Sequence, residues 1–294
     1  MQYQLEFKLL GNYEITLNGR RIEQRMPRKT AALLIYLAHQ QRVHSRDQIL
    51  HLLWGDQLVS GSTNLRVALT KLRAIVGECL ESTRQSVSLA PDCHVWADVL
   101  VLEQAIVDNL QQIAPHTVIS PEVETALRTG LALYHGPFLD EFGLPYAPAF
   151  MAWVEEERNR AAQLMRLAYR SLTENCLFNG RLADGIALGE RWLAFDPCDQ
   201  AAVRSLMRLY YRADQDELVR AVFEGLQARM EANGTDEPEL ETRELYATMA
   251  SQRGLQPGTT GGAFHAPHPR WRSAPHNVPA SLYPLIGRGG VGVS

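Results

Sequence analysis

Lysine and cysteine are scarce in this chain of 294 residues, and long apolar runs are missing. No stretch approaches the roughly 18 uncharged apolar residues of a membrane-spanning helix, so we expect no span. The first residues lack a basic segment followed by an apolar one, which argues against a secretory signal. The four cysteines, Cys79, Cys93, Cys176 and Cys198, include no C-x-x-C pair. Their spacing favours free thiols in a reducing cytoplasm over a disulfide framework or a zinc site.

The motifs of common enzyme classes are missing too. Neither G-x-S-x-G nor H-E-x-x-H occurs. The histidines are isolated, and those in the tail (His265, His268 and His276) are expected to be incidental rather than metal ligands. The acidic run Glu155–Glu157 is typical of a solvated helix face rather than of a catalytic carboxylate pair. The sequence therefore predicts a protein that is not an enzyme and has no cofactor and no metal.

Charge is divided unevenly along the chain. Residues 1–97 hold 12 Lys and Arg against 8 Asp and Glu, whereas residues 98–294 hold 17 against 25. All three lysines, Lys8, Lys29 and Lys71, lie in the first part. This layout is expected where only the first part of a chain meets a polyanion.

The first hundred residues alternate between strand and helix patterns. Apolar and polar residues alternate over 3–9, and the hairpin dipeptide Asn18-Gly19 separates a strand at 14–17 from a return strand at 20–23. Pro27 and the apolar segment 30–38 predict a helix. A capping box, Ser45-x-x-Gln48, opens a second helix that ends at Trp54-Gly55.

A third helix is predicted from about Ser62 to Val76. Its apolar positions, Leu65, Leu69, Leu72 and Val76, form one stripe, and the opposite side carries Thr63, Arg66, Thr70 and Arg73, with Lys71 on a flank. Short strands at 80–82 and 87–89 then flank a turn with the basic residue Arg84, and a last strand is expected at 94–97.

From residue 98 to about 253 the pattern is helical. Helices are expected at 100–110, 121–133, 150–178, 182–195, 199–213 and 216–232, the later ones as pairs with a period near 34 residues. The predicted fold class is mainly α, with an α+β winged helix-turn-helix domain at residues 1–97 and an all-α, tetratricopeptide-like domain at 98–253. Residues 254–294, rich in Gly, Pro, Ser and His, are expected to form a disordered linker or truncated tail.

Several segments together resemble a known family. The order of strands, three helices and a hairpin resembles the OmpR/PhoB-type winged helix. "FKLLGNYEITLNGRRI", "RKTAALLIYLA", "RVHSRDQILHLLWGD" and "STNLRVALTKLRAIVG" look more closely like the antibiotic-regulatory-protein type of transcriptional activator. "LALYHGPFLDEF", "WVEEERNR" and the long segment 179–215 are similar to the bacterial transcriptional activator domain of that family.

The resemblance implies a cytoplasmic, nucleoid-associated transcription activator that binds repeated sites in double-stranded DNA near promoters as a homodimer or tandem protomers. Its half-sites would lie about one helical turn apart. The implied DNA-binding residues are Thr63, Asn64, Arg66, Thr70, Lys71 and Arg73 in the third helix, with Arg84 and Gln85 in the hairpin. The loop 55–61, above all Gly55, Asp56 and Gln57, would face RNA polymerase. Activation rather than repression follows from the resemblance alone.

Two other functions stay open. The chain could be a helical-repeat scaffold for protein interaction whose DNA-binding domain is vestigial; the basic stripe of the third helix favours DNA binding instead. It could also be an ATP-dependent switch, because Gly287–Ser294 has the spacing of a phosphate loop. Val293, however, stands where that loop requires Lys, so no nucleotide binding is expected.

Overall fold

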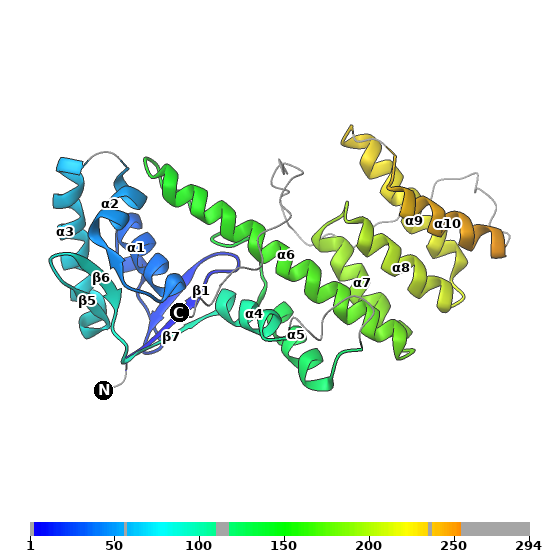
Figure 1. The fold of residues 1–294 in the computed structure, drawn as a ribbon, viewed down its shortest axis with the longest axis horizontal. Coiled ribbons are helices and arrows are strands. Elements are labelled where there is room, and N and C mark those ends of the chain that lie inside the picture. The colour runs from blue at the N-terminus through cyan, green and yellow to red at the C-terminus, as the bar shows by residue number, and fades with distance from the viewer. Residues whose placement is uncertain (1–2, 56–57, 110–117, 235–236, 254–294) are drawn as a thin grey trace, which may run out of the picture.

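The computed structural model describes residues 3–55, 58–109, 118–234 and 237–253. A region of strands and short helices lies at one end of the molecule, and stacked helices occupy the other end (Figure 1). The expected tail at 254–294, with its phosphate-loop-like segment and its histidines, lies outside the described residues. No helix in the described ranges is long and apolar enough to cross a membrane.

The chain begins in a four-stranded sheet with the order β3-β2-β1-β7. Its strands are β1 (Tyr3–Lys8), β2 (Glu14–Leu17), β3 (Arg20–Arg21) and β7 (Cys93–Ala97). The three N-terminal strands pair antiparallel, and the turn places Asn18 and Gly19 at positive φ, as the dipeptide predicts. The return strand is shorter than expected, because a 3-10 helix begins at Glu23. β7 pairs parallel with β1, which brings residue 97 back to the start of the chain.

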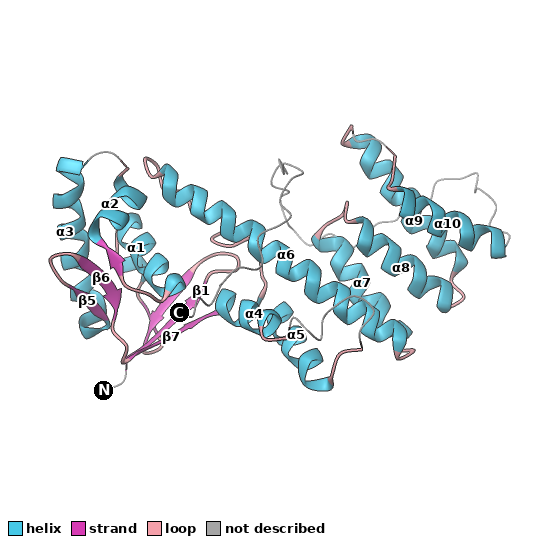
Figure 2. Cartoon of the chain, in the orientation of Figure 1, coloured by secondary structure: helices cyan, strands magenta, loops and turns pink. Residues whose placement is uncertain are grey.

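Three helices and a small sheet complete this region (Figure 2). The helices are α1 (Arg28–Gln40), α2 (Arg46–Trp54) and α3 (Leu58–Val76); the sheet, of order β4-β6-β5, contains β4 (His44–Ser45), β5 (Leu80–Ser82) and β6 (Ser86–Leu89). α3 packs against α1 and α2, and the β5–β6 hairpin follows it as a wing. The arrangement is a winged helix-turn-helix.

The rest of the described chain is helical. Its helices are α4 (Asp98–Val107), α5 (Pro121–Leu133), α6 (Pro148–Phe178), α7 (Leu182–Phe195), α8 (Gln200–Arg212), α9 (Asp216–Ala232) and α10 (Leu240–Arg253). From α6 to α9 each helix packs on the next, and α10 packs on α8 and α9, as in paired helical repeats. The mainly α fold class is therefore confirmed, with its strands confined to the N-terminal region.

An ion-pair cluster holds the first stacked helices together. Glu124 of α5 accepts hydrogen bonds from Arg181, at 2.8 and 2.7 Å, and from Arg128 at 2.9 Å. The hydrogen bonds from Arg181, followed in effect by those from Arg128, lower the pKa of Glu124 to about 2, although burial acts in the opposite direction. Arg128 also donates to Asp184 of α7 at 2.6 Å. These contacts link α5 to α7 across the end of α6.

Long α6 joins the two regions by packing on both α2 and α7 (Figure 1). In its N-terminal half, the Trp153 ring packs edge-on to the rings of Tyr36 and His39 in α1. Glu157 Oε2 lies 3.3 Å from His39 Nε2, and both side chains are buried. The helical region therefore packs directly on α1, one of the two helices against which α3 docks.

Asp98 forms a second contact between the winged-helix region and the helical region. Its buried carboxylate accepts the backbone N–H groups of Leu9 at 2.8 and 2.9 Å, Leu10 at 3.1 Å and Val99 at 2.8 Å. Burial raises the pKa of Asp98, and the backbone hydrogen bonds partly oppose that rise. An antiparallel bridge between Leu10 and Phe138 continues the contact into the helical region.

The cysteines correct one expectation from the sequence. Cys79 and Cys93 are joined by a disulfide with a Cα–Cα distance of 5.3 Å, whereas we expected free thiols. They lie 14 residues apart, and the wing hairpin between them turns the chain back so that both meet at its base. Cys176 and Cys198 are free, as predicted. The argument from cysteine spacing for a reducing compartment accordingly loses its basis.

Thiol counting checks this bridge. Unfolded without reductant, the protein is expected to take up alkylating reagent at Cys176 and Cys198 only, because the other two sulfurs are bonded to each other. After reduction all four cysteines should react. Intact-mass spectrometry gives both numbers, and four labels before reduction would contradict the disulfide.

Candidate nucleic-acid interface

The exposed face of α3 is the most distinctive surface of the winged-helix region. Its buried stripe consists of Leu65, Leu69, Leu72 and Val76, which dock on α1 and α2. Thr63, Asn64, Arg66, Thr70 and Lys71 are all exposed, as the sequence predicts. α3 contains no acidic residue, and it lies at the end of the molecule opposite α9 and α10 (Figure 1). The helix therefore presents an unobstructed, cationic surface.

Two cations on this face are free to meet a ligand. Within the described part of the chain, the side chains of Arg66 and Lys71 form no hydrogen bond or ion pair. Arg73 differs, because its Nη2 donates to Ser82 Oγ at 3.0 Å and to the Leu80 carbonyl at 3.4 Å. These bonds tie the C-terminal end of α3 to β5. Arg73 is thus placed to position the wing as well as to face a ligand.

The wing presents the remaining predicted residues. Arg84 and Gln85 are exposed at the tip of the β5–β6 hairpin. The Thr83 hydroxyl oxygen accepts the backbone N–H groups of Gln85 at 3.1 Å and Ser86 at 3.0 Å, which shapes the turn. The backbone N–H of Arg46, at the start of α2, donates to the Gln85 carbonyl at 2.9 Å. The hairpin tip is therefore anchored to α2 and, through Arg73, its base is anchored to α3.

The start of α2 is fixed by its own residues. Ser45 Oγ accepts the Gln48 N–H at 3.1 Å, and Gln48 Oε1 accepts the Ser45 N–H at 3.0 Å, so the capping box is confirmed. The helix ends before Gly55, whose φ is 59°.

The predicted polymerase-facing loop is shorter than expected. α3 begins at Leu58, so residues 58–61 are helical rather than part of a loop 55–61. Of the three residues singled out there, Gly55 follows α2, and Asp56 and Gln57 lie outside the described residues. The physical reason is the close packing of Gly61, where a Cβ would lie 3.3 Å from a Leu50 methyl and 3.4 Å from the Trp54 Cβ. The glycine thus serves helix packing, not a turn.

One basic residue near this loop was not identified from the sequence. The Lys29 ammonium lies 5.1 Å from the centre of the Trp54 ring, a cation–π contact. Burial lowers the pKa of Lys29. A lysine in a short apolar segment gives no periodic signal, so only the packing of α1 against α2 reveals this cation beside the end of α2.

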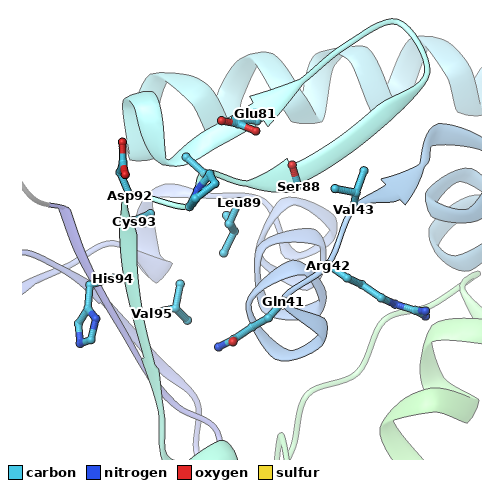
Figure 3. A pocket seen from close by; sticks show the side chains of 12 residues that line it. Gln41, Arg42, Val43, Glu81, Ser88, Leu89, Asp92, Cys93, His94 and Val95 are labelled. Carbon is cyan, nitrogen blue, oxygen red and sulfur yellow. The ribbon is translucent and has the colours of Figure 1, made fainter. Parts of the chain in front are cut away.

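A pocket of about 910 Å³ lies behind the wing (Figure 3). It is lined by residues 41–43, by Glu81 and by residues 88–95. In Figure 3 the Arg42 and His94 side chains extend to opposite sides rather than toward a common centre. Among the described residues, no group of three or more His, Cys, Asp or Glu side chains could hold a metal ion. The pocket is therefore a hollow beside the wing without an assembled set of reactive groups.

These features define a class of protein, a winged helix-turn-helix region joined to a stack of paired helices. Residues 118–249 match the family model of the bacterial transcriptional activator domain. The matched family model describes a domain of transcriptional activators, not of enzymes.

A solved structure shares this architecture. The structure of Mycobacterium tuberculosis EmbR in complex with a low-affinity phosphopeptide is similar to this chain with a TM-score of 0.68 and 19% sequence identity. The match covers 85% of this chain and 66% of that chain, and at this identity it establishes the fold. A comparison with curated proteins gives no match. The resemblance to the antibiotic-regulatory-protein type of activator, with its two regions, is confirmed.

Proposed function

We propose that this protein activates transcription by binding double-stranded DNA with α3 in the major groove. In this proposal residues 1–97 are the DNA-binding domain and residues 98–253 are the domain that joins protomers or receives a signal. The exposed, acid-free face of α3 is the observation that carries the proposal. The recognition helix of a helix-turn-helix protein docks by an apolar stripe and offers polar and cationic side chains to the bases.

Each exposed residue type on α3 has a partner in the major groove. Arg66 can donate two hydrogen bonds to guanine, Asn64 can pair with adenine, and Lys71 can contact guanine or a phosphate. Arg84 at the wing tip would contact phosphates or the minor groove, with Gln85 beside it. Lys29 and Gly55 lie near the end of α2, where we place the contact with RNA polymerase. Two protomers would bind repeated half-sites about one helical turn apart.

Selection of bound fragments from random duplex DNA, at near-physiological salt, tests this proposal. The wild-type chain should enrich a repeated motif, and the Arg66→Ala variant should enrich it more weakly and with a relaxed preference at one base position. Arg212→Ala is the matched control, because Arg212 is exposed at the far end of α8. If the wild type enriches no motif and binds DNA only weakly and in a salt-sensitive way, the proposal is overturned in favour of a helical-repeat scaffold.

The wing makes a separate prediction. Arg84→Ala should weaken binding by a similar factor on selected and unrelated DNA, because a phosphate contact carries no base information. The slope of log K against log salt should fall by about one, the value expected for one lost phosphate contact. Fluorescence anisotropy titrations at several salt concentrations measure both. If the salt slope of Arg84→Ala is unchanged and equals that of Arg212→Ala, Arg84 does not contact DNA.

A further inference from the structure

The outermost line of α3 is uncharged. Val67 follows Thr63 by four residues and precedes Thr70 by three, and Ala74 follows Thr70 by four. Residues three and four apart lie above one another on a helix, so these four side chains form one line opposite the buried stripe. By the same spacing Arg66 lies on one flank of the line and Lys71 on the other. All of these residues are exposed.

Val67 is the unexpected member of this line. It is 47% exposed, although the buried stripe of α3 lies on the other side of the helix. The isopropyl group therefore contributes nothing to docking α3 on α1 and α2. A single exposed valine is ordinary on a protein surface, but this one lies between two cations in the middle of the proposed reading face.

Thr70 extends the apolar character of the line. Its hydroxyl donates a hydrogen bond to the Arg66 carbonyl at 2.9 Å. The hydroxyl proton is thus used inside the helix, and Thr70 has no proton to offer to a base. What remains for a ligand is its methyl group and acceptor lone pairs, beside the isopropyl group of Val67.

We propose that Val67 reads the methyl group of thymine in the major groove. This inference rests on the proposed function of α3 and adds to it a specificity-determining residue. The C5-methyl group is the apolar mark by which the major-groove edge of thymine differs from those of the other bases. The cations on the two flanks would hold the helix in the groove, and the line through Val67 would then face the floor of the groove.

Removal of single methyl groups from the DNA tests the inference. In the selected site, each thymine is replaced in turn by uracil, which keeps the base pair and loses only the methyl group. For the wild type, at least one replacement should weaken binding about three- to fivefold, the effect of losing one buried methyl group. Val67→Ala should bind the unmodified site more weakly than the wild type does. The uracil replacement that weakens wild-type binding should weaken the binding of this variant little further.

The matched control is Val43→Ala. Val43 is 67% exposed and lies between α1 and β4 in the same region of the protein, away from α3. This variant should respond to uracil as the wild type does. The inference is overturned if no uracil replacement weakens wild-type binding. It is also overturned if the replacement that weakens wild-type binding weakens the binding of Val67→Ala by the same factor. A selected site without thymine would overturn it as well.

The test separates this inference from the proposed function. If Arg66→Ala relaxes the motif while uracil has no effect, α3 remains the reading helix and Val67 does not read thymine. If Val67→Ala binds DNA as the wild type does, its exposed side chain is available to a protein partner instead. If no motif is selected at all, both proposals fail together.

Discussion

Replacement of Arg66 by alanine is expected to weaken binding to the selected DNA site about 5- to 150-fold, or about 1–3 kcal/mol. Arg66 is exposed on α3, and within the described residues no carboxylate neutralises it. The variant loses a fork that can donate two hydrogen bonds to guanine. Preference at one base position should therefore relax, while unrelated DNA loses less affinity. Anisotropy titrations with the selected site and its single-base variants measure both effects.

Two further variants sharpen this test. Arg66→Lys keeps the charge but loses the planar fork, so it should recover part of the affinity without recovering the base preference. Arg212→Ala should match the wild type throughout. If Arg66→Ala keeps the wild-type affinity and motif, α3 is not the reading helix, whatever the wing contributes.

Arg73 was assigned to the same face by sequence periodicity, yet its surroundings differ. Its bonds to Leu80 and Ser82 could not be foreseen, because they depend on how the hairpin folds back on α3. Periodicity shows which side of a helix a residue occupies. It does not show whether a neighbouring strand already uses the side chain.

Local chemistry predicted many element boundaries. Pro121 follows the N-cap Ser120, and α5 runs from Pro121 to Leu133 as expected. The capping box at Ser45 fixed the start of α2 equally well. The start of α3 was predicted about four residues too late, and Gly61, which permits close packing on α2, lies inside the helix.

Contacts between residues that lie far apart along the chain could not be predicted from the sequence. The parallel pairing of β1 with β7 joins residues about 90 positions apart, and no local signal specifies it. The Cys79–Cys93 bridge follows from the hairpin between its two ends, which spacing rules do not describe. The packing of Trp153 on α1 is a third case, since its helix pattern shows an apolar face but not the partner.

Asp98→Asn is expected to lower the free energy of unfolding by about 3 kcal/mol. Both carboxylate oxygens of Asp98 accept backbone N–H groups, from Leu9, Leu10 and Val99. An amide of the same shape must turn its NH₂ group toward at least one of these donors. A buried N–H that loses its acceptor costs about 1–3 kcal/mol, and hydrogen bonds to a charged acceptor are the stronger kind.

Urea denaturation of the whole chain, followed by circular dichroism, measures this effect. Asp92→Asn is the matched control, because Asp92 is exposed in the turn before β7. Its unfolding free energy should stay within about 0.5 kcal/mol of the wild type. If the two variants unfold at the same urea concentration, the N–H groups at the end of β1 do not depend on Asp98. Leu9 and Leu10 belong to the winged-helix region, and Asp98 begins the first helix of the helical region. A lower unfolding free energy in Asp98→Asn alone would therefore show that this one carboxylate contributes much of the stability of the contact between the two regions.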